Sequence, residues 1–271
     1  MSRPLASTTS QPPQEAFFRK PDAMLFVRSL LFNIFAWLTI LLGATLVLLT
    51  FWAPQRFHWW VCVSWCRFAT WSINFFCGID VAVEGRENIP DEPCLIMLKH
   101  TSTFETFWHV TVFPQTAWVV KREMMWIPLI GWAIYLALDP IAINRESGRS
   151  AIKQVIEQGK EKFARGIWVS VFPEGTRMPP GETRRYGSSG AALAREAGVK
   201  ILPIAHNAGD LWQRRSFIKR PGTVRVRIGP LIDPAERPPK EVNLIAQQWI
   251  ETQMHEISSA YKDKYAQPSP D

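Results

Sequence analysis

The feature that most limits what this chain can fold into is a stretch without charge near its N-terminus. From Ser29 to Ala53, 25 successive positions carry no charged side chain. As a helix rising 1.5 Å per residue, this stretch is about 36 Å long, enough to cross a hydrocarbon core of about 30 Å with some tilt. The run is too long for the apolar core of a cleaved signal peptide, and no small-x-small site follows it. The sequence therefore predicts a membrane anchor here.

A second apolar stretch, Trp59 to Cys77, follows closely and differs from the first in its polar residues. Arg67 interrupts it, and Ser64, Arg67 and Asn74 fall on one face of a helix. This pattern suits a helix in the headgroup region better than one that crosses the core. We expect either a hairpin that dips into one leaflet or one span plus an interfacial helix. Basic residues flank the pair on both sides, which favours the cytoplasmic side for both flanks.

The remainder of the chain alternates between short β-prone runs and helical ones. The expected strands are 80–84, 94–99, 116–120, 140–143, 167–172, 200–205 and 223–228, and the expected helices are 103–113, 123–137, 147–163, 188–197 and 241–261. This alternation predicts an α/β domain with a mostly parallel sheet, whose ligands collect at the carboxyl ends of the strands. We expect a disordered lead-in over 1–22, the anchor over 23–78, the catalytic domain over 79–265 and a loose tail over 266–271.

The best candidate for catalysis lies at the end of one expected strand. His100 follows the apolar run Cys94 to Leu98, and Glu105 lies five residues further, in a Thr/Ser-rich helix start. A turn between strand and helix allows Glu105 to reach one ring nitrogen of His100, while the other nitrogen removes a proton from a hydroxyl. A histidine beside a strand is also commonly structural. Ser102 is an alternative nucleophile, but the chain has no Gly-x-Ser-x-Gly elbow.

Other polar residues follow neighbouring strands. The segment Phe172 to Arg177 combines the carboxylate of Glu174, the flexible backbone of Gly175, the hydroxyl of Thr176 and the guanidinium of Arg177, whose planar fork suits a phosphate. A simple Glu174–Arg177 pair across a turn is the structural alternative. Lys121 and Arg145 also follow strands and could add charge to one phosphate pocket, although either could be an ordinary solvated residue.

Charge and cysteine content narrow the possible partners. The net charge of +7 and the pI of about 9.4 fit anionic lipid, a phosphate-bearing substrate, an acidic carrier protein or nucleic acid. The basic and aromatic segment 211–220, beside an anchor, favours headgroups or an acyl carrier over nucleic acid, and a plain solvated loop is equally compatible. The four cysteines and five histidines show no zinc spacing and no His-Glu-x-x-His motif, so we expect no metal and no cofactor.

These residues, in this order, resemble the lysophospholipid acyltransferases that make phosphatidic acid, the bacterial 1-acyl-glycerol-3-phosphate acyltransferase family. The resemblance covers Ile79 to Asp233. Four blocks carry it: His100-x4-Glu105, Lys121 through Gly131 to Asn144-Arg145, Phe172 to Arg177, and Ile201 to Ile204. It implies a glycerolipid-acyltransferase-like sheet flanked by helices behind a two-helix membrane anchor.

The resemblance also implies roles for single residues. His100 would be the general base and Glu105 its orienting acid. Arg177, Lys121 and Arg145 would clamp the phosphate, and Glu174, with Gly175 and Thr176, would help hold the glycerol part. Two positions depart from the family pattern, since Glu105 stands where Asp is usual and Asn144 where Asp is common.

The implied reaction is acyl transfer at the cytoplasmic face of a bacterial inner membrane. His100 would deprotonate the sn-2 hydroxyl of a lysophospholipid acceptor as it attacks the thioester of acyl-CoA or an acyl carrier protein, with backbone donors near the helix start stabilising the oxyanion. Neither an acyl-enzyme nor a cofactor is needed. The alternatives are another acceptor such as a lyso-ornithine lipid, a hydrolase, and a non-catalytic lipid-binding membrane protein.

Overall fold

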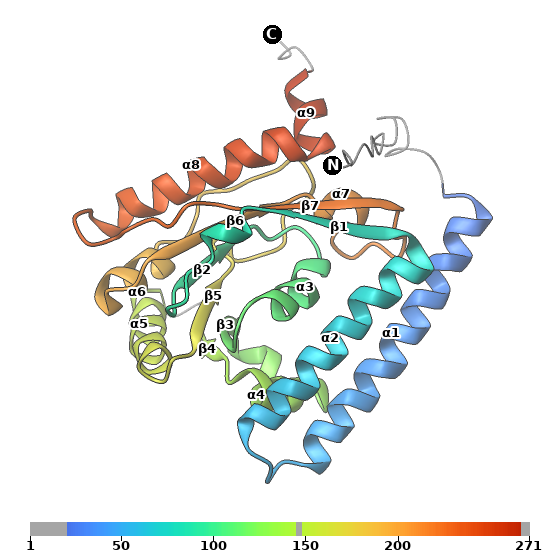
Figure 1. The fold of residues 1–271 in the computed structure, drawn as a ribbon, viewed down its shortest axis with the longest axis horizontal. Helices are drawn as coiled ribbons and strands as arrows, with labels where there is room; N and C mark the ends of the chain where they lie inside the picture. Colours follow the sequence, from blue (N-terminus) through green and yellow to red (C-terminus); the bar gives the residue numbers. More distant parts are fainter. Residues whose placement is uncertain (1–20, 145–147, 267–271) are drawn as a thin grey trace, which may run out of the picture.

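The computed structural model describes residues 21–144 and 148–266 and contains a sheet of seven strands in the order β1-β7-β6-β2-β5-β3-β4 (Figure 1). Neighbouring strands are parallel except β6 and β7, which are antiparallel. The strands are β1 (Ile79–Glu84), β2 (Leu95–Leu98), β3 (Thr116–Lys121), β4 (Ile141–Ile143), β5 (Trp168–Val171), β6 (Ile201–His206) and β7 (Gly222–Ile228). The predicted α/β class and all seven predicted strands are confirmed.

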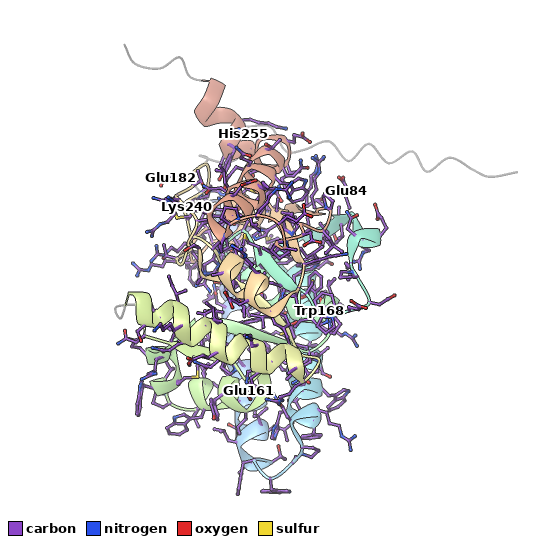
Figure 2. The ribbon with its side chains drawn as sticks, turned by 90° about the vertical axis from the view of Figure 1, so that its left-hand side faces the viewer. Glu84, Glu161, Trp168, Glu182, Lys240 and His255 are labelled. Carbon is purple, nitrogen blue, oxygen red and sulfur yellow. The ribbon has the colours of Figure 1, made fainter. Side chains whose placement is uncertain are left out.

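Helices cover both faces of this sheet, which explains why its central strands are apolar without interruption. Alternate residues of β2 point to opposite faces, so Leu95 and Met97 join one core cluster while Ile96 and Leu98 join the other. The first cluster lies under α5 (Arg149–Ala164), α6 (Ser189–Ala197) and α8 (Pro239–Ile257); Figure 2 views the molecule from the side of α5, whose outer surface carries Glu161. The second cluster includes residues of α1 (Ala23–Leu49), α2 (Gln55–Cys77) and α3 (Phe104–Val112).

The helix predicted over 123–137 is two separate elements, and this part of the prediction is wrong. The chain forms the short 3-10 helix η3 (Arg122–Trp126) and then the helix α4 (Ile130–Leu138). Pro128 explains the break, because proline lacks an N–H and disfavours helical backbone at the residue before it. The following residue, Leu129, has a positive φ of 62°, so the chain changes direction sharply between η3 and α4.

The predicted C-terminal helix is also divided, because α8 ends at Ile257 and α9 (Ser259–Ala266) begins after Ser258. The buried carboxylate of Asp210 explains the bend. It accepts hydrogen bonds from the hydroxyl of Ser258 and from the N–H and hydroxyl of Ser259. Asp210 belongs to the one-turn helix α7 (Ala208–Leu211), which the sequence did not predict, as it did not predict the 3-10 turn η2 (Arg86–Asn88).

The N-terminal segment is a hairpin in which α1 and α2 lie side by side and antiparallel (Figure 1). Among the helices of the described residues, α1 is the one long and apolar enough to cross a membrane. The two-helix anchor expected from the sequence therefore contains one candidate span, α1. The hydropathy of α2 is lower because it contains Arg67 and other polar residues. It nevertheless packs against α1.

A buried lysine ties this hairpin to the catalytic domain. Lys219 is 1% exposed; its N–H donates to the hydroxyl of Ser29 at 3.0 Å, and its ammonium donates to the side-chain oxygen of Asn33. The same ammonium lies 4.8 Å from the ring of Trp212, a cation–π contact. The basic and aromatic segment 211–220 thus packs against the first turns of α1.

Candidate active site

His100 and Glu105 meet at the carboxyl end of β2, as the sequence predicts. The Nδ1 atom of His100 lies 2.9 Å from Oε1 of Glu105. Four non-helical residues separate β2 from the cap of α3, and they turn the chain so that the two side chains face each other. Since an ionised carboxylate only accepts hydrogen bonds, the Nδ1 atom carries the proton and Nε2 is the basic nitrogen.

Glu105 is held in its charged form although it is 1% exposed. Burial acts to raise its pKa, but the hydrogen bonds from His100 and from the N–H of Ser102 outweigh it, so the pKa is lowered. The Oε1 atom accepts from the N–H groups of Thr101 at 3.1 Å and Ser102 at 2.9 Å. A permanently charged acceptor of this kind orients the imidazole and stabilises the imidazolium.

The backbone of His100 is fixed by the segment that follows β5. The His100 N–H donates to Oε2 of Glu174 at 2.7 Å, and its carbonyl accepts from the N–H of Met178 at 2.8 Å. The imidazole stacks on Phe172, with ring centroids 4.0 Å apart. The two strongest sequence blocks, 100–105 and 172–177, therefore form one rigid unit.

Beneath this unit lies a buried charge network that the sequence reasoning missed. Lys99 is fully buried, and its Nζ atom lies 2.5 Å from Glu174 and 2.8 Å from Glu251. Glu251 belongs to α8 and accepts hydrogen bonds from the hydroxyls of Tyr186 and Tyr261, at 2.8 and 2.7 Å. The network links the His100 loop to the C-terminal helices. One signal was available, since a lysine directly after the run 94–98 requires a buried partner, but nothing in the sequence identifies Glu251 as that partner.

Glu174 lies inside the protein and not on the substrate side. It is 3% exposed, and its two carboxylate oxygens face Lys99 and the His100 N–H. Burial raises its pKa to about 7, while Lys99 and the His100 N–H act to lower it. These contacts favour a positioning role over the glycerol contact that the resemblance implies.

His206 is a second positioning residue that the sequence reasoning missed. It is buried at the end of β6, and its Nε2 atom lies 2.7 Å from the carbonyl of Lys99. Its Nδ1 atom accepts from the N–H of Ala208, so Nε2 carries the proton and donates to Lys99. Burial, the largest effect, lowers its pKa. The chain therefore holds a neutral histidine behind the catalytic loop.

Arg177 is placed to bind an anion. Its Nε atom is buried and makes no hydrogen bond within residues 21–144 and 148–266. An unpaired buried donor costs about 1–3 kcal/mol, so this geometry favours a negatively charged ligand. Gly175 has a positive φ of 69° and its N–H closes a turn onto Phe172, which carries Thr176 and Arg177 away from the strand.

The other expected phosphate ligands are not all described. Lys121 ends β3, is exposed, and lies at the same edge of the sheet as His100, with β5 between their strands. Arg145 lies outside the described residues. The structure therefore groups His100, Glu105 and the segment 172–177, and places Lys121 two strands away.

An apolar cavity of about 210 Å³ adjoins Arg177. Its walls come from α1, α2, α3 and α4, and Trp118 of β3 also lines it. The lining residues are almost all apolar: Ile40, Gly43, Ala44, Val47, Val61, Cys62, Trp65, Cys66, Thr106, Phe107, Trp118, Met124, Ile130, Ala133, Ile134, Ala137 and Leu138. A cationic group at the edge of an apolar cavity suits a ligand with an anionic head and a hydrocarbon chain.

The expected oxyanion donors at the start of α3 are already used. The N–H groups of Thr101 and Ser102 donate to Glu105, and the N–H of Phe104 donates to the hydroxyl of Ser102 at 3.2 Å. For these three groups the expectation is wrong. Two of them stabilise the Glu105 carboxylate, and the third holds the Ser102 side chain.

The Glu105→Gln variant is expected to lose about 10²-fold or more in kcat, because a neutral amide does not stabilise the imidazolium and does not select the tautomer. Glutamine still accepts from Thr101 and Ser102, so the fold should remain. The Glu105→Asp variant keeps the charge and serves as the matched control. Equal activity of the two variants would show that the charge of Glu105 is not what matters.

Known proteins resemble this chain in sequence. A family model described as Acyltransferase matches residues 80–207. A 1-acyl-sn-glycerol-3-phosphate acyltransferase of Pseudomonas aeruginosa is 43% identical over 226 residues, which are 82% of this chain and 86% of that protein. The human 1-acyl-sn-glycerol-3-phosphate acyltransferase alpha is 28% identical over 177 residues, which are 64% of this chain and 62% of that protein.

The fold has a solved counterpart as well. The crystal structure of the 1-acyl-sn-glycerophosphate acyltransferase from Thermotoga maritima superimposes with a TM-score of 0.70, covering 90% of this chain and 97% of that one at 23% identity. The strands β2 and β5, whose ends carry the candidate active site, both lie inside the segment that the family model matches. With these similarities and this site, the chain belongs to the 1-acyl-sn-glycerol-3-phosphate acyltransferase family.

Proposed function

We propose that the protein transfers a fatty acyl chain from a thioester to the sn-2 hydroxyl of 1-acyl-sn-glycerol-3-phosphate and so makes phosphatidic acid. One observation carries the proposal: the His100–Glu105 pair shares a rigid unit with Arg177, whose buried Nε lacks a partner among the described residues. A base beside an anion-binding group fits a hydroxyl substrate that bears a phosphate. The names of the bacterial and human relatives support the same acceptor.

In the proposed reaction, Nε2 of His100 removes the proton from the acceptor hydroxyl as its oxygen attacks the thioester carbonyl. The C–S bond of the thioester breaks, and the departing thiolate takes up the proton from the imidazolium, which Glu105 has stabilised, to leave as the free thiol. The acyl donor is acyl-CoA or an acyl carrier protein, and no cofactor takes part. Arg177, with Lys121 and Arg145, binds the phosphate and so positions the hydroxyl at His100.

The proposed site of action is the bacterial inner membrane, with the catalytic domain on the cytoplasmic face. The apolar helix α1 supports membrane association, and the basic residues that flank the hairpin support the cytoplasmic side. The exposed Arg214 and Arg215 lie in the segment that packs beside α1, where anionic headgroups would meet them.

The Arg177→Ala variant tests the acceptor. We expect its KM for 1-acyl-glycerol-3-phosphate to rise about tenfold to a hundredfold, because a charge-assisted bond to phosphate contributes about 1.5–3 kcal/mol. The KM for the acyl donor should change little. The assay uses detergent-solubilised protein and a panel of lysolipids with and without phosphate.

The matched control is Arg195→Ala, which removes the same charge from an exposed position on α6. If the protein acylates a phosphate-free lysolipid, and the Arg177→Ala variant does so at the same rate, the acceptor is not 1-acyl-glycerol-3-phosphate. Release of free fatty acid in place of an acylated lipid would identify a hydrolase.

A further inference from the structure

The helix α4 presents two unlike faces, although its nine residues include no charged side chain. Its inner face carries small residues such as Ala133 and Ala137, which are buried and line the apolar cavity. Its outer face exposes aromatic rings: Trp132 is 50% exposed and Tyr135 is 59% exposed. A helix in water would normally carry polar residues on such a face.

The preceding segment η3 and the turn after it continue this apolar surface. Trp126 is 76% exposed, Ile127 is 45% exposed and Leu129 is 40% exposed. The positive φ of Leu129 holds the turn in an unusual conformation that leaves this side chain outside the core. Large exposed apolar patches on a single chain mark a surface that another apolar phase covers.

The position of α4 identifies what covers it. Ala133 packs in one cluster with Ala44 and Val47 near the end of α1 and with Val61 near the start of α2. At this hairpin turn Phe51 is 67% exposed, Trp52 is 73% exposed and Trp60 is 61% exposed. Figure 1 shows α4 beside the same ends of α1 and α2, far from α8. The helix α4 thus packs beside the end of the candidate membrane helix where the hairpin exposes its own aromatic rings.

The exposed aromatic residues of η3 and α4 are of the types found at the surface of a bilayer. Tryptophan and tyrosine combine an apolar ring with one polar atom, and they gather where protein passes from hydrocarbon to headgroups. The charged residues Arg122 and Glu123 lie at the start of η3, whereas the surface from Trp126 through α4 carries no charge.

From this continuity we infer that η3 and α4 form a third membrane-contacting segment, which rests in the same bilayer as the α1–α2 hairpin through Trp126, Trp132 and Tyr135. The inference depends on the membrane association included in the proposed function. It adds that the catalytic domain itself, and not only its N-terminal hairpin, contacts lipid.

The test places one fluorescent label at each of three positions of similar exposure. The variants are Tyr135→Cys on α4, Trp37→Cys on α1 as the membrane reference, and Leu244→Cys on α8 as the aqueous reference; the native side chains are 59%, 60% and 52% exposed. Cys62→Ser serves as the background, because the other three cysteines are buried. Each variant of the full chain is labelled with an environment-sensitive NBD dye and bound to phosphatidylcholine–phosphatidylglycerol vesicles.

We expect the label at 135 to shift to the blue and to be quenched by lipids with a doxyl group on the acyl chain as strongly as the label at 37. Aqueous iodide should quench only the label at 244. If 135 behaves like 244 while 37 is quenched by lipid, α4 faces water and the inference is wrong. If both quenchers fail at 135, a second copy of the chain covers α4, and the inference is equally wrong. If lipid quenches neither 37 nor 135, membrane insertion of the hairpin itself fails.

Discussion

The His100→Ala variant is expected to lose acyl transfer by a factor of about 10² to 10⁴, the usual contribution of a positioned general base. Its protein should still fold, because the two hydrogen bonds of the His100 backbone remain in alanine and Glu105 keeps the hydrogen bonds from the N–H groups of Thr101 and Ser102. The loss should fall on kcat, with little change in the KM for either substrate. Initial rates at saturating acceptor and donor measure it.

A second variant separates the role of His100 as a base from the packing of its ring. The imidazole also stacks on Phe172, so alanine removes a contact as well as a base. His100→Phe restores an aromatic ring without a basic nitrogen and should be as inactive as His100→Ala. If the phenylalanine variant recovered near-normal kcat, the ring would serve only for packing and His100 would not be the base.

The Lys99→Met variant is expected to lose about 3–5 kcal/mol of unfolding free energy, because it leaves the buried carboxylate of Glu174 and the partly buried one of Glu251 without their shared cation. Glu174 and Glu251 both face Lys99, at 2.5 and 2.8 Å. Methionine fills a similar volume, so the loss reflects charge and not a cavity. Denaturant unfolding in detergent, followed by near-UV circular dichroism, measures it.

Two comparisons make this prediction specific. The double variant Lys99→Met, Glu251→Gln removes one of the two like charges and should recover part of the stability. Arg237→Ala breaks an exposed ion pair with Glu241 on α8 and should cost no more than about 1 kcal/mol. A Lys99→Met loss as small as that of Arg237→Ala would show that the buried network contributes little to stability.

Local sequence patterns predicted much of the fold because they report local burial. The central strands are short apolar runs, the outer strands β1 and β7 alternate apolar and polar residues, and each of these seven patterns corresponds to a strand. The catalytic pair was also predictable, because five residues and one turn connect His100 to Glu105. The segment 172–177 follows the neighbouring strand β5, so parallel pairing brings it to the same edge.

The parts that sequence reasoning missed depend on contacts between distant residues. Glu251 lies 152 positions from Lys99, and only the packing of α8 on the sheet brings them together. The break between η3 and α4 was visible in Pro128, but the apolar periodicity around it outweighed that signal. Glu174 looked like a substrate ligand because the sequence shows its charge and not the buried lysine opposite it.

The most direct test of the proposed function is the product formed by the purified protein from labelled oleoyl-CoA and 1-acyl-glycerol-3-phosphate. We expect labelled phosphatidic acid, with the label released by an sn-2-specific phospholipase and absent with the His100→Ala protein. Acyl carrier protein loaded with the same chain replaces the CoA donor in a parallel reaction. Failure of both donors to yield phosphatidic acid, or equal yield from the His100→Ala protein, would contradict the proposed function and the assigned base.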